Sequence, residues 1–410
     1  MRFLIALAWK NLSRYRRRTI ITALAIAVGL GVYLWMDAWI YGVKLDSQRN
    51  LVFYEMGAAK VMKASYWKDL GSFPLKESIE NLSLVEERLR PLGVQMTRRV
   101  PFSGEVFLGE GSLFIRLEGI DPVSDGRLFR LKESVEQGRY LQPGEQGLLI
   151  GAGLAKDLKA ALGDLITVRC RTRQGAFQTF DLEVVGILNS PNPQVNRRYA
   201  YLPLSLVDEM LQMEGRVTEL VLFFSGWDRP EQKVEQIKTA LADLPGLAAV
   251  SWKLLASDYF AALRGDTIGN TLMLFLVFII AAVGISNTML MAVMERHREV
   301  GMMRALGMKD GQIRLSFLLE AAGIGLIGAL GGLALGAALS FWIVTWGVDY
   351  SSLLEGMDYG YRVKGLMRGA WHPEAFAGAF IFALLASMVF SFIPTGRAVR
   401  MQIAACLRSQ

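Results

Sequence analysis

Two acidic side chains lie within or beside long apolar stretches, and they are the residues best placed to carry chemistry. Asp37 lies near the far end of the first apolar run, and Glu320 lies a short way into the third. A carboxylate inside a bilayer is costly and marks a functional or paired site by default. A proton relay would need a second acid or histidine at matching depth, and the pattern offers none. We predict that Asp37 lies at the outer interface and that Glu320 is paired with an arginine near the cytoplasmic boundary.

Cysteine, histidine and methionine do not form the clusters that a metal site needs. The chain has two cysteines, Cys170 and Cys406, and two histidines, His297 and His372. These numbers are too small for a disulfide framework or a His/Cys metal centre. Six of the 18 methionines lie near the inner membrane boundary, where adaptable packing is the expected role: Met289, Met291, Met294, Met302, Met303 and Met308. The sequence predicts neither a metal site nor a disulfide.

Glycines in the third apolar run match a nucleotide-binding pattern, but in the wrong context. Gly323-x-Gly325-x-x-Gly328 follows no strand and has no acidic residue at the expected distance. The chain also lacks the phosphate-binding loop of ATPases, the zinc-binding H-E-x-x-H and the nucleophilic G-x-S-x-G. We therefore expect no enzyme activity and no cofactor in this chain.

The same run places glycines at a spacing that favours helix packing. Gly328, Gly332 and Gly336 recur at every fourth position and form a flat strip on one helix face. Such strips let a second helix approach closely in a membrane. The partner could be a helix of this chain or of another subunit.

A short charged segment lies between the second and third apolar runs. Within 295–314 an apolar stripe, Val300, Met303 and Leu306, is flanked by charges. A helix with apolar anchors and a charged rim is suited to a groove on a partner protein. The alternative is an ordinary basic loop at the membrane boundary. The candidate contact residues are Glu299, Val300, Gly301, Met303, Arg304, Leu306 and Gly307.

Four apolar runs are long enough to span a bilayer, which needs about 20 residues. The chain of 410 residues is 52% hydrophobic, with a mean hydropathy of +0.30, and the apolar excess is concentrated in these runs. The sequence predicts a membrane protein with four transmembrane helices. The expected spans are 19–43, 267–294, 315–347 and 375–395.

Basic residues near the span ends set the orientation. Arginine and lysine are concentrated in residues 1–18, in 295–314 and in the tail 396–410. Positive loops face the cytoplasm, and four spans put all three segments on that side. The large insert 44–266 and the loop 348–374 then face outward.

The N-terminal segment is predicted to be an amphipathic helix lying on the membrane surface. Residues 2–13 place Phe3, Leu7 and Trp9 where they can enter the membrane interface, and a basic cluster follows. Apolar side chains can enter the interface while the basic ones attract anionic headgroups. The alternative is a frayed start to the first span. The basic residues are Lys10, Arg14, Arg16, Arg17 and Arg18.

The outward insert has the pattern of a mixed α/β domain. Apolar alternation in 113–117 and 182–188 predicts strands, and glycine and proline interrupt the elements. An insert of this length can form its own core. Helices are predicted for 76–90, 152–162, 204–213 and 230–243.

The amino-acid sequences of several segments resemble those of a known family. Beside 295–307, the matching residues are Phe317–Glu320, Gly119–Pro122, Gly138-Arg139, Leu149–Gly151, Gly163-Asp164, Val184–Ile187 and Tyr201–Leu204. They resemble FtsX-like ABC transporter permeases, including the MacB-type and the lipoprotein-releasing (LolC/LolE-type) permeases. The insert is similar to the MacB-like periplasmic domain.

This resemblance implies a permease subunit of the cytoplasmic (inner) membrane, crossing it several times. ATP would be bound by a separate ABC ATPase, two copies of which would dock beneath the coupling segment 295–314. A second permease, identical or related, would complete the complex, and ATP-driven motion would pass to the periplasmic domain. The implied substrate is a lipid or lipoprotein, and no nucleic acid is expected.

One departure from the lipoprotein-releasing pattern leaves the role open. In that branch, the permease that recruits the periplasmic carrier has a long hook before the Val184–Ile187 strand. Here the connection 171–179 is short. The chain could be the non-recruiting partner, an efflux permease, a signalling permease that activates a periplasmic partner, or a membrane anchor without an ATPase.

Overall fold

The computed structural model describes the chain apart from residues 1–7, 9, 15, 110, 351–360 and 401–410. The chain divides into two compact units, each described by itself below. The first contains Met1–Lys44, Leu263–Asp349 and Leu366–Gln410, and the second contains Leu45–Ala262 and Tyr350–Gly365. The bounds of the predicted insert, 44–266, therefore nearly match those of the second unit, which also includes part of the predicted loop 348–374.

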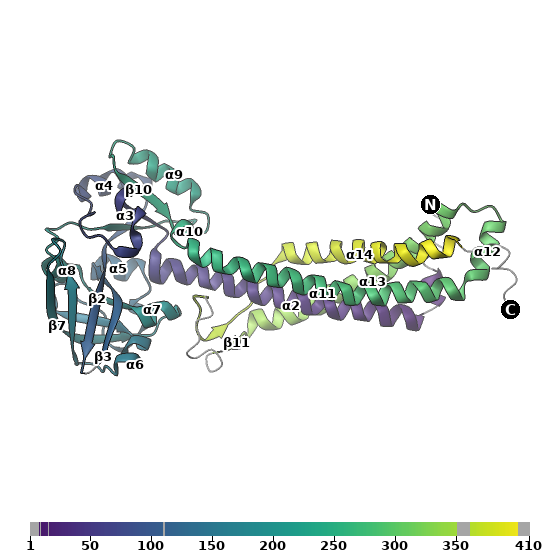
Figure 1. The fold of residues 1–410 in the computed structure, drawn as a ribbon, viewed down its shortest axis with the longest axis horizontal. Helices are drawn as coiled ribbons and strands as arrows, with labels where there is room; N and C mark the ends of the chain where they lie inside the picture. The colour runs from purple at the N-terminus through teal and green to yellow at the C-terminus, as the bar shows by residue number, and fades with distance from the viewer. Residues whose placement is uncertain (1–7, 9, 15, 110, 351–360, 401–410) are drawn as a thin grey trace. The chain divides into compact units, whose positions relative to one another are not determined.

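Long helices form the first unit (Figure 1). They are α2 (Arg16–Leu51), α11 (Ser257–Glu295), α13 (Asp310–Thr345) and α14 (Pro373–Arg400). Three helices among the described residues are long and apolar enough to cross a membrane: Thr19–Met56, Asp310–Thr345 and Pro373–Gly396. They cover the predicted first, third and fourth spans. The predicted second span, 267–294, lies within α11 and stays a prediction, so the number of four spans is not confirmed.

The glycine strip of α13 packs against α2 of the same chain. A Cβ atom added to any of the three glycines would lie 2.8 Å from a side-chain Cβ of α2. The pairs are Gly328 with Ile26, Gly332 with Leu30 and Gly336 with Leu34. Residue numbers rise together along both helices, so α2 and α13 run parallel. That direction is the one required if the first and third spans cross the membrane the same way.

Polar pairs join helices of the bundle. The hydroxyls of Thr22 on α2 and Thr288 on α11 are 2.7 Å apart. Further along α2, the carboxylate of Asp37 lies 2.7 Å from Nδ1 of His372, in the connection before α14. The imidazole also stacks on Tyr41, with ring centroids 4.1 Å apart. Asp37 is thus a paired acid.

The second unit is built on one sheet of ten strands. Following their hydrogen bonds from β2 through β3, β8, β5, β7 and β6 leads back to β2, so six strands close into a small barrel. Strands β9, β1 and β10 extend the sheet from the first half of β2, and β4 adds to β7. The strands are β1 (Ala59–Lys63), β2 (Gln95–Leu108), β3 (Gly111–Ile120), β4 (Val135–Gly138), β5 (Gly147–Gly151), β6 (Leu165–Arg171), β7 (Phe177–Leu188), β8 (Tyr199–Pro203), β9 (Glu219–Phe223) and β10 (Leu247–Ser251).

Short helices complete this mixed α/β unit, whose class agrees with the prediction. The predicted helical ranges contain α4 (Leu82–Leu89), α6 (Ala152–Leu158), α8 (Leu204–Leu211) and α9 (Glu231–Ala240). The others are α3 (Ala64–Lys68), α5 (Pro122–Leu128), α7 (Pro193–Arg198) and α10 (Trp252–Leu255). Apolar side chains at alternate positions of the barrel strands, and so on one face of each strand, form one continuous core, in which Phe102, Leu117 and Ile150 are almost fully buried.

Both long helices that reach this unit continue directly into neighbouring strands. After Leu51 the chain makes one π-helical turn, Val52–Met56, and enters β1. Strand β10 pairs antiparallel with β1, and α10 and α11 follow it. The amide of Trp252 donates to the carbonyl of Ala58 at 3.1 Å, and the indole is fully buried. At both points, backbone hydrogen bonds hold the few residues that lie between the long helix and the strand.

Candidate functional site

The segment predicted to contact a partner forms helix α12, His297–Ala305. Gly307 ends it with a left-handed backbone (φ 88°), a conformation that favours glycine. The amide of Gly307 donates to Arg304 and that of Met308 to Met303, both at 3.0 Å, which satisfies the last carbonyls. The charged segment is therefore a short, well-terminated helix followed at once by α13.

The predicted apolar stripe does not share one face of this helix. Val300 is only 2% exposed and packs with Val293, Ile313 and Phe317, and Met303 lies partly buried against the same cluster. Leu306, in contrast, is 87% exposed. With 3.6 residues per turn, positions six apart differ by about 120° around the helix. The stripe therefore turns from the protein interior to the surface.

A partner can reach only part of the predicted contact set. Met302 is 52% exposed and joins Leu306 as an outward apolar group. Gly307 is exposed, whereas Gly301 is buried like Val300. Val300 and Gly301 are covered by the chain itself in this structure, and their contact with a partner stays a prediction.

The charges of α12 pair within the chain and form an ion-pair cluster, which we define as Asn11, Arg14, Arg296, Glu299 and Glu320. Arg296 donates to Glu299 at 2.6 Å and to Glu320 at 3.2 Å. Arg14 contacts the other oxygen of Glu299 at 3.1 Å, and the amide of Asn11 lies 3.5 Å from Glu320. The prediction that Glu320 is paired with a nearby arginine is confirmed.

This ion-pair cluster ties three parts of the chain to one another. It joins the N-terminal segment, α12 and α13, and its centre is buried, with Arg296 5% and Glu320 2% exposed, whereas Arg14 is 66% exposed. Removing one partner of a buried pair leaves an uncompensated charge. The cluster therefore fixes the orientation of α12, and Glu299 serves this purpose with both of its oxygens.

The remaining predicted basic residues lie at the surface. Arg304 pairs with Asp310 at 3.2 Å. Arg16 donates to the carbonyl of Ser13 at 3.0 Å, and Lys10, Arg16 and Arg17 are exposed. Residues 10–14 are helical, while most of the predicted surface helix 2–13 and the side chain of Arg18 lie outside the described part.

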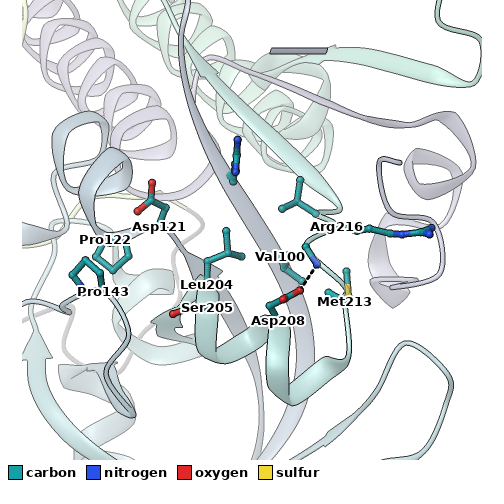
Figure 2. A pocket seen from close by; sticks show the side chains of 12 residues that line it. Val100, Asp121, Pro122, Pro143, Leu204, Ser205, Asp208, Met213 and Arg216 are labelled. Carbon is teal, nitrogen blue, oxygen red and sulfur yellow. Dashed lines mark hydrogen bonds between the residues drawn. The ribbon is translucent and has the colours of Figure 1, made fainter. Parts of the chain in front are cut away.

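The second unit has an open pocket of about 320 Å³ between β2, α5 and α8 (Figure 2). Its charged groups are engaged in the fold. Asp208 accepts from the amide of Gly215 at 2.7 Å, and Asp121 caps α5 through the amide of Val123 at 3.1 Å. Arg98 makes two hydrogen bonds to Glu86. These contacts are structural and do not assemble a nucleophile with a base.

A buried cluster of charged residues in the same unit was not foreseen from the sequence. Arg99 lies between Asp125, at 2.7 Å, and Glu118, at 2.6 Å, and all three side chains are almost fully buried. Burial raises the pKa of Asp125 to about 6 in spite of its arginine. Burial also opposes ionisation of Glu118, but Arg116 and Arg99 outweigh it and hold the pKa of Glu118 below its usual range. No periodicity signals such a cluster, because its members come from separate elements.

Two family models match this chain. Residues 19–244 match the MacB-like periplasmic core domain, and residues 271–403 match the FtsX-like permease C-terminal domain. An uncharacterized ABC transporter permease of Methanocaldococcus jannaschii is 24% identical over 99% of this chain and 98% of its own. The lipoprotein-releasing system transmembrane protein LolE of Haemophilus influenzae is 26% identical over 76% of each chain.

Other relatives match shorter parts. The pyoverdine export ATP-binding/permease protein PvdT of Pseudomonas aeruginosa is 33% identical over 32% of this chain and 17% of its own. Among solved structures, the periplasmic region of MacB from Actinobacillus actinomycetemcomitans covers 49% of this chain and 91% of its own. Its TM-score is 0.34 and its sequence identity 16%.

Proposed function

Because the chain belongs to the FtsX-like ABC transporter permeases with a MacB-like periplasmic core domain, we propose that it is the permease subunit of a mechanotransmission-type transporter in the inner membrane. Permeases of this family work with an ATPase subunit. The chain contains no phosphate-binding loop, so in this proposal a separate ATPase binds and hydrolyses ATP. Two ATPase copies would serve a pair of permeases, identical or related.

The observation that carries the proposal is the exposed end of α12. Leu306, with Met302 beside it, presents apolar surface at a helix whose orientation is fixed by the ion-pair cluster. An exposed apolar side chain of this kind is suited to a groove on a partner protein. Because α12 is held in place, a displacement caused by the partner would be transmitted to the residues that hold the helix. The direct continuity of α2 with β1 and of β10 with α11 supports transmission into the periplasmic core.

For the substrate we propose lipoproteins or lipids released from the inner membrane. The support is similarity to LolE over most of the chain. The link between β6 and β7 is a tight turn in which the amide of Thr172 donates to the carbonyl of Ala176 at 2.8 Å. With so short a link, we propose that a periplasmic carrier, if the system uses one, is recruited by the partner permease.

Efflux is the second candidate, favoured by the match of 132 residues to a pyoverdine export protein. Gene neighbours separate the two. A neighbouring ATPase and second permease would support lipoprotein release, whereas a membrane-fusion protein would support efflux. Lipids and lipoproteins that co-purify with the complex, identified by mass spectrometry, would test the substrate directly.

The test of ATPase coupling is Leu306→Asp. Central apolar anchors of interfaces often carry about 2 kcal/mol or more, which is roughly a 30-fold change in affinity. We expect Leu306→Asp to lose the ATPase on purification or to abolish substrate-stimulated hydrolysis. Lys309→Ala, an exposed neighbour, serves as the matched control and should have little effect. If Leu306→Asp retains both the ATPase and stimulated hydrolysis at the wild-type level, the coupling proposal is wrong.

A further inference from the structure

The turn that joins α2 to β1 holds a buried carboxylate that the proposed function does not use. Glu55 lies on the π-helical turn Val52–Met56 and is only 6% exposed. The turn ends at Gly57, whose amide donates to the carbonyl of Val52 at 3.0 Å. Single π-helical turns occur frequently at functional sites.

Groups from the periplasmic core hold this carboxylate in place. One oxygen accepts from the hydroxyl of Tyr199 on β8 at 2.9 Å, and the other accepts from the side-chain amide of Asn192 at 2.8 Å. The backbone carbonyl of Glu55 lies 3.4 Å from the guanidinium of Arg99, in the buried charged cluster. A buried carboxylate needs such partners to offset its lost hydration. Glu55 therefore connects the end of α2 to the interior of the core.

The same carboxylate meets an arginine from a distant part of the chain. Arg362, in the connection between α13 and α14, places Nε 3.6 Å from Glu55. Its backbone amide donates to the hydroxyl of Ser47 at 2.7 Å, and its carbonyl accepts from Asn50 at 2.7 Å. Ser47 and Asn50 are both buried. Arg362 is thus contacted by Ser47 and Asn50 on α2 and by Glu55 in the turn that follows α2.

A second contact holds the connection to the core. Nζ of Lys364 donates to the side-chain oxygen of Asn189 at 2.8 Å. Asn189 also accepts from Asn196 on α7, at 3.3 Å. The segment 361–365 is therefore fixed to the second unit, although it lies in sequence between two membrane helices.

We propose that Arg362 is a positioning residue that couples the α13–α14 connection to the joint between α2 and β1 through Glu55. The inference rests on the proposed function and adds a second route for motion. The first route is the continuity of α2 and α11 with the sheet, and the second carries displacement of α13 and α14 into the same joint. When the arginine is removed, Glu55 keeps its hydrogen bonds from Tyr199 and Asn192, and Nε of Arg362 lies 3.6 Å from the carboxylate, so we expect the pair to add little to stability. Its effect should therefore appear in transmission rather than in folding.

The experiment compares Arg362→Ala with Arg362→Lys and with Arg368→Ala, which removes an exposed arginine from the same connection. The complex with its ATPase is purified in lipid nanodiscs, and hydrogen exchange is measured with and without ATP. We expect Arg362→Ala to retain the ATPase, its hydrolysis rate and its thermal midpoint. The ATP-dependent change in exchange across β1 and β8 should fall about fivefold or more, in line with typical coupling between sites.

The other variants sharpen the result. Arg362→Lys should restore part of the ATP-dependent change, and Arg368→Ala should behave as wild type. Asn50→Ala, which frees the backbone of Arg362 but leaves its guanidinium, should reduce the change as well. A wild-type response in Arg362→Ala would overturn the proposal.

The two proposals can fail separately. If no ATPase co-purifies with the wild type, the proposed function is wrong. The Arg362 contact is then tested without nucleotide, where Arg362→Ala should speed exchange at residues 361–365 and in the turn Val52–Met56. Unchanged exchange at both places would refute the contact itself.

Discussion

Replacing Gly332 by leucine should force α2 and α13 apart. A Cβ atom at this position would lie 2.8 Å from Leu30 Cβ and 3.2 Å from the carbonyl of Ala27, closer than side chains normally pack. Overpacking a close contact costs about 1–3 kcal/mol, and a full leucine adds atoms that have no space at all. The helical preference of any residue over glycine returns at most about 1 kcal/mol. We expect Gly332→Leu to destabilise the bundle by roughly 3 kcal/mol.

The assay is thermal unfolding of the purified protein in detergent. Ala334→Leu, on the exposed side of the same helix, adds a comparable side chain and should change the midpoint little. Leu30→Ala opens space opposite Gly332, so combining it with Gly332→Leu should cost less than the sum of the single changes, by about 0.5–3 kcal/mol. Equal midpoints for Gly332→Leu and Ala334→Leu, or strict additivity with Leu30→Ala, would refute close packing at this strip.

Three further predictions test other parts of the structure. Arg296→Ala should destabilise the protein by about 3–5 kcal/mol, since it removes the arginine that compensates the buried carboxylate of Glu320, and combining it with Glu320→Gln should recover part of that loss in the same unfolding assay. Burial raises the pKa of Cys170 to about 11, so in a Cys406→Ser background its thiol should resist maleimide in the folded protein up to about pH 9 and react only after unfolding; rapid labelling of Cys170 in this native variant would contradict this. In intact cells, a cysteine at Ser225 should react with an impermeant thiol reagent and one at Ser13 should not, whereas the reverse pattern would exclude the predicted orientation.

The sequence predicted what depends on composition and local period. Apolar runs predicted four spans, of which three are long and apolar enough to cross a membrane among the described residues, and the spacing of Gly328, Gly332 and Gly336 revealed a packing surface. The sequence could not identify the helix that packs there, because a strip of small residues indicates close packing but not which helix is the neighbour. The class of the second unit followed from alternation, while closure of six strands into a barrel depends on pairings between strands far apart in the chain.

The sequence could not assign the partners of charged side chains that lie far apart in the chain. Glu299 was predicted to contact a partner protein, and the structure pairs its carboxylate with Arg14, 285 positions away, as well as with the nearby Arg296. Glu55 and Arg362 gave no signal, because neither belongs to a periodic pattern and their contact depends on the fold of the whole unit. Val300 and Leu306 lie on different sides of α12 because an apolar spacing of three residues drifts around a helix rather than keeping to one side.

The burial of Val300 also affects how a force on α12 should be transmitted. If Val300 contacted a partner, the force would act on a helix face that is only loosely attached to the rest of the chain. Val300 instead packs with Phe317 and Ile313 of α13, and Arg296 binds Glu320 on the same helix. A force applied at Leu306 would therefore reach α13 first, through both apolar and ionic contacts. Since α13 packs along α2 at the glycine strip, the two helices should move together, and a substitution that separates them should weaken transmission even where the ATPase still binds.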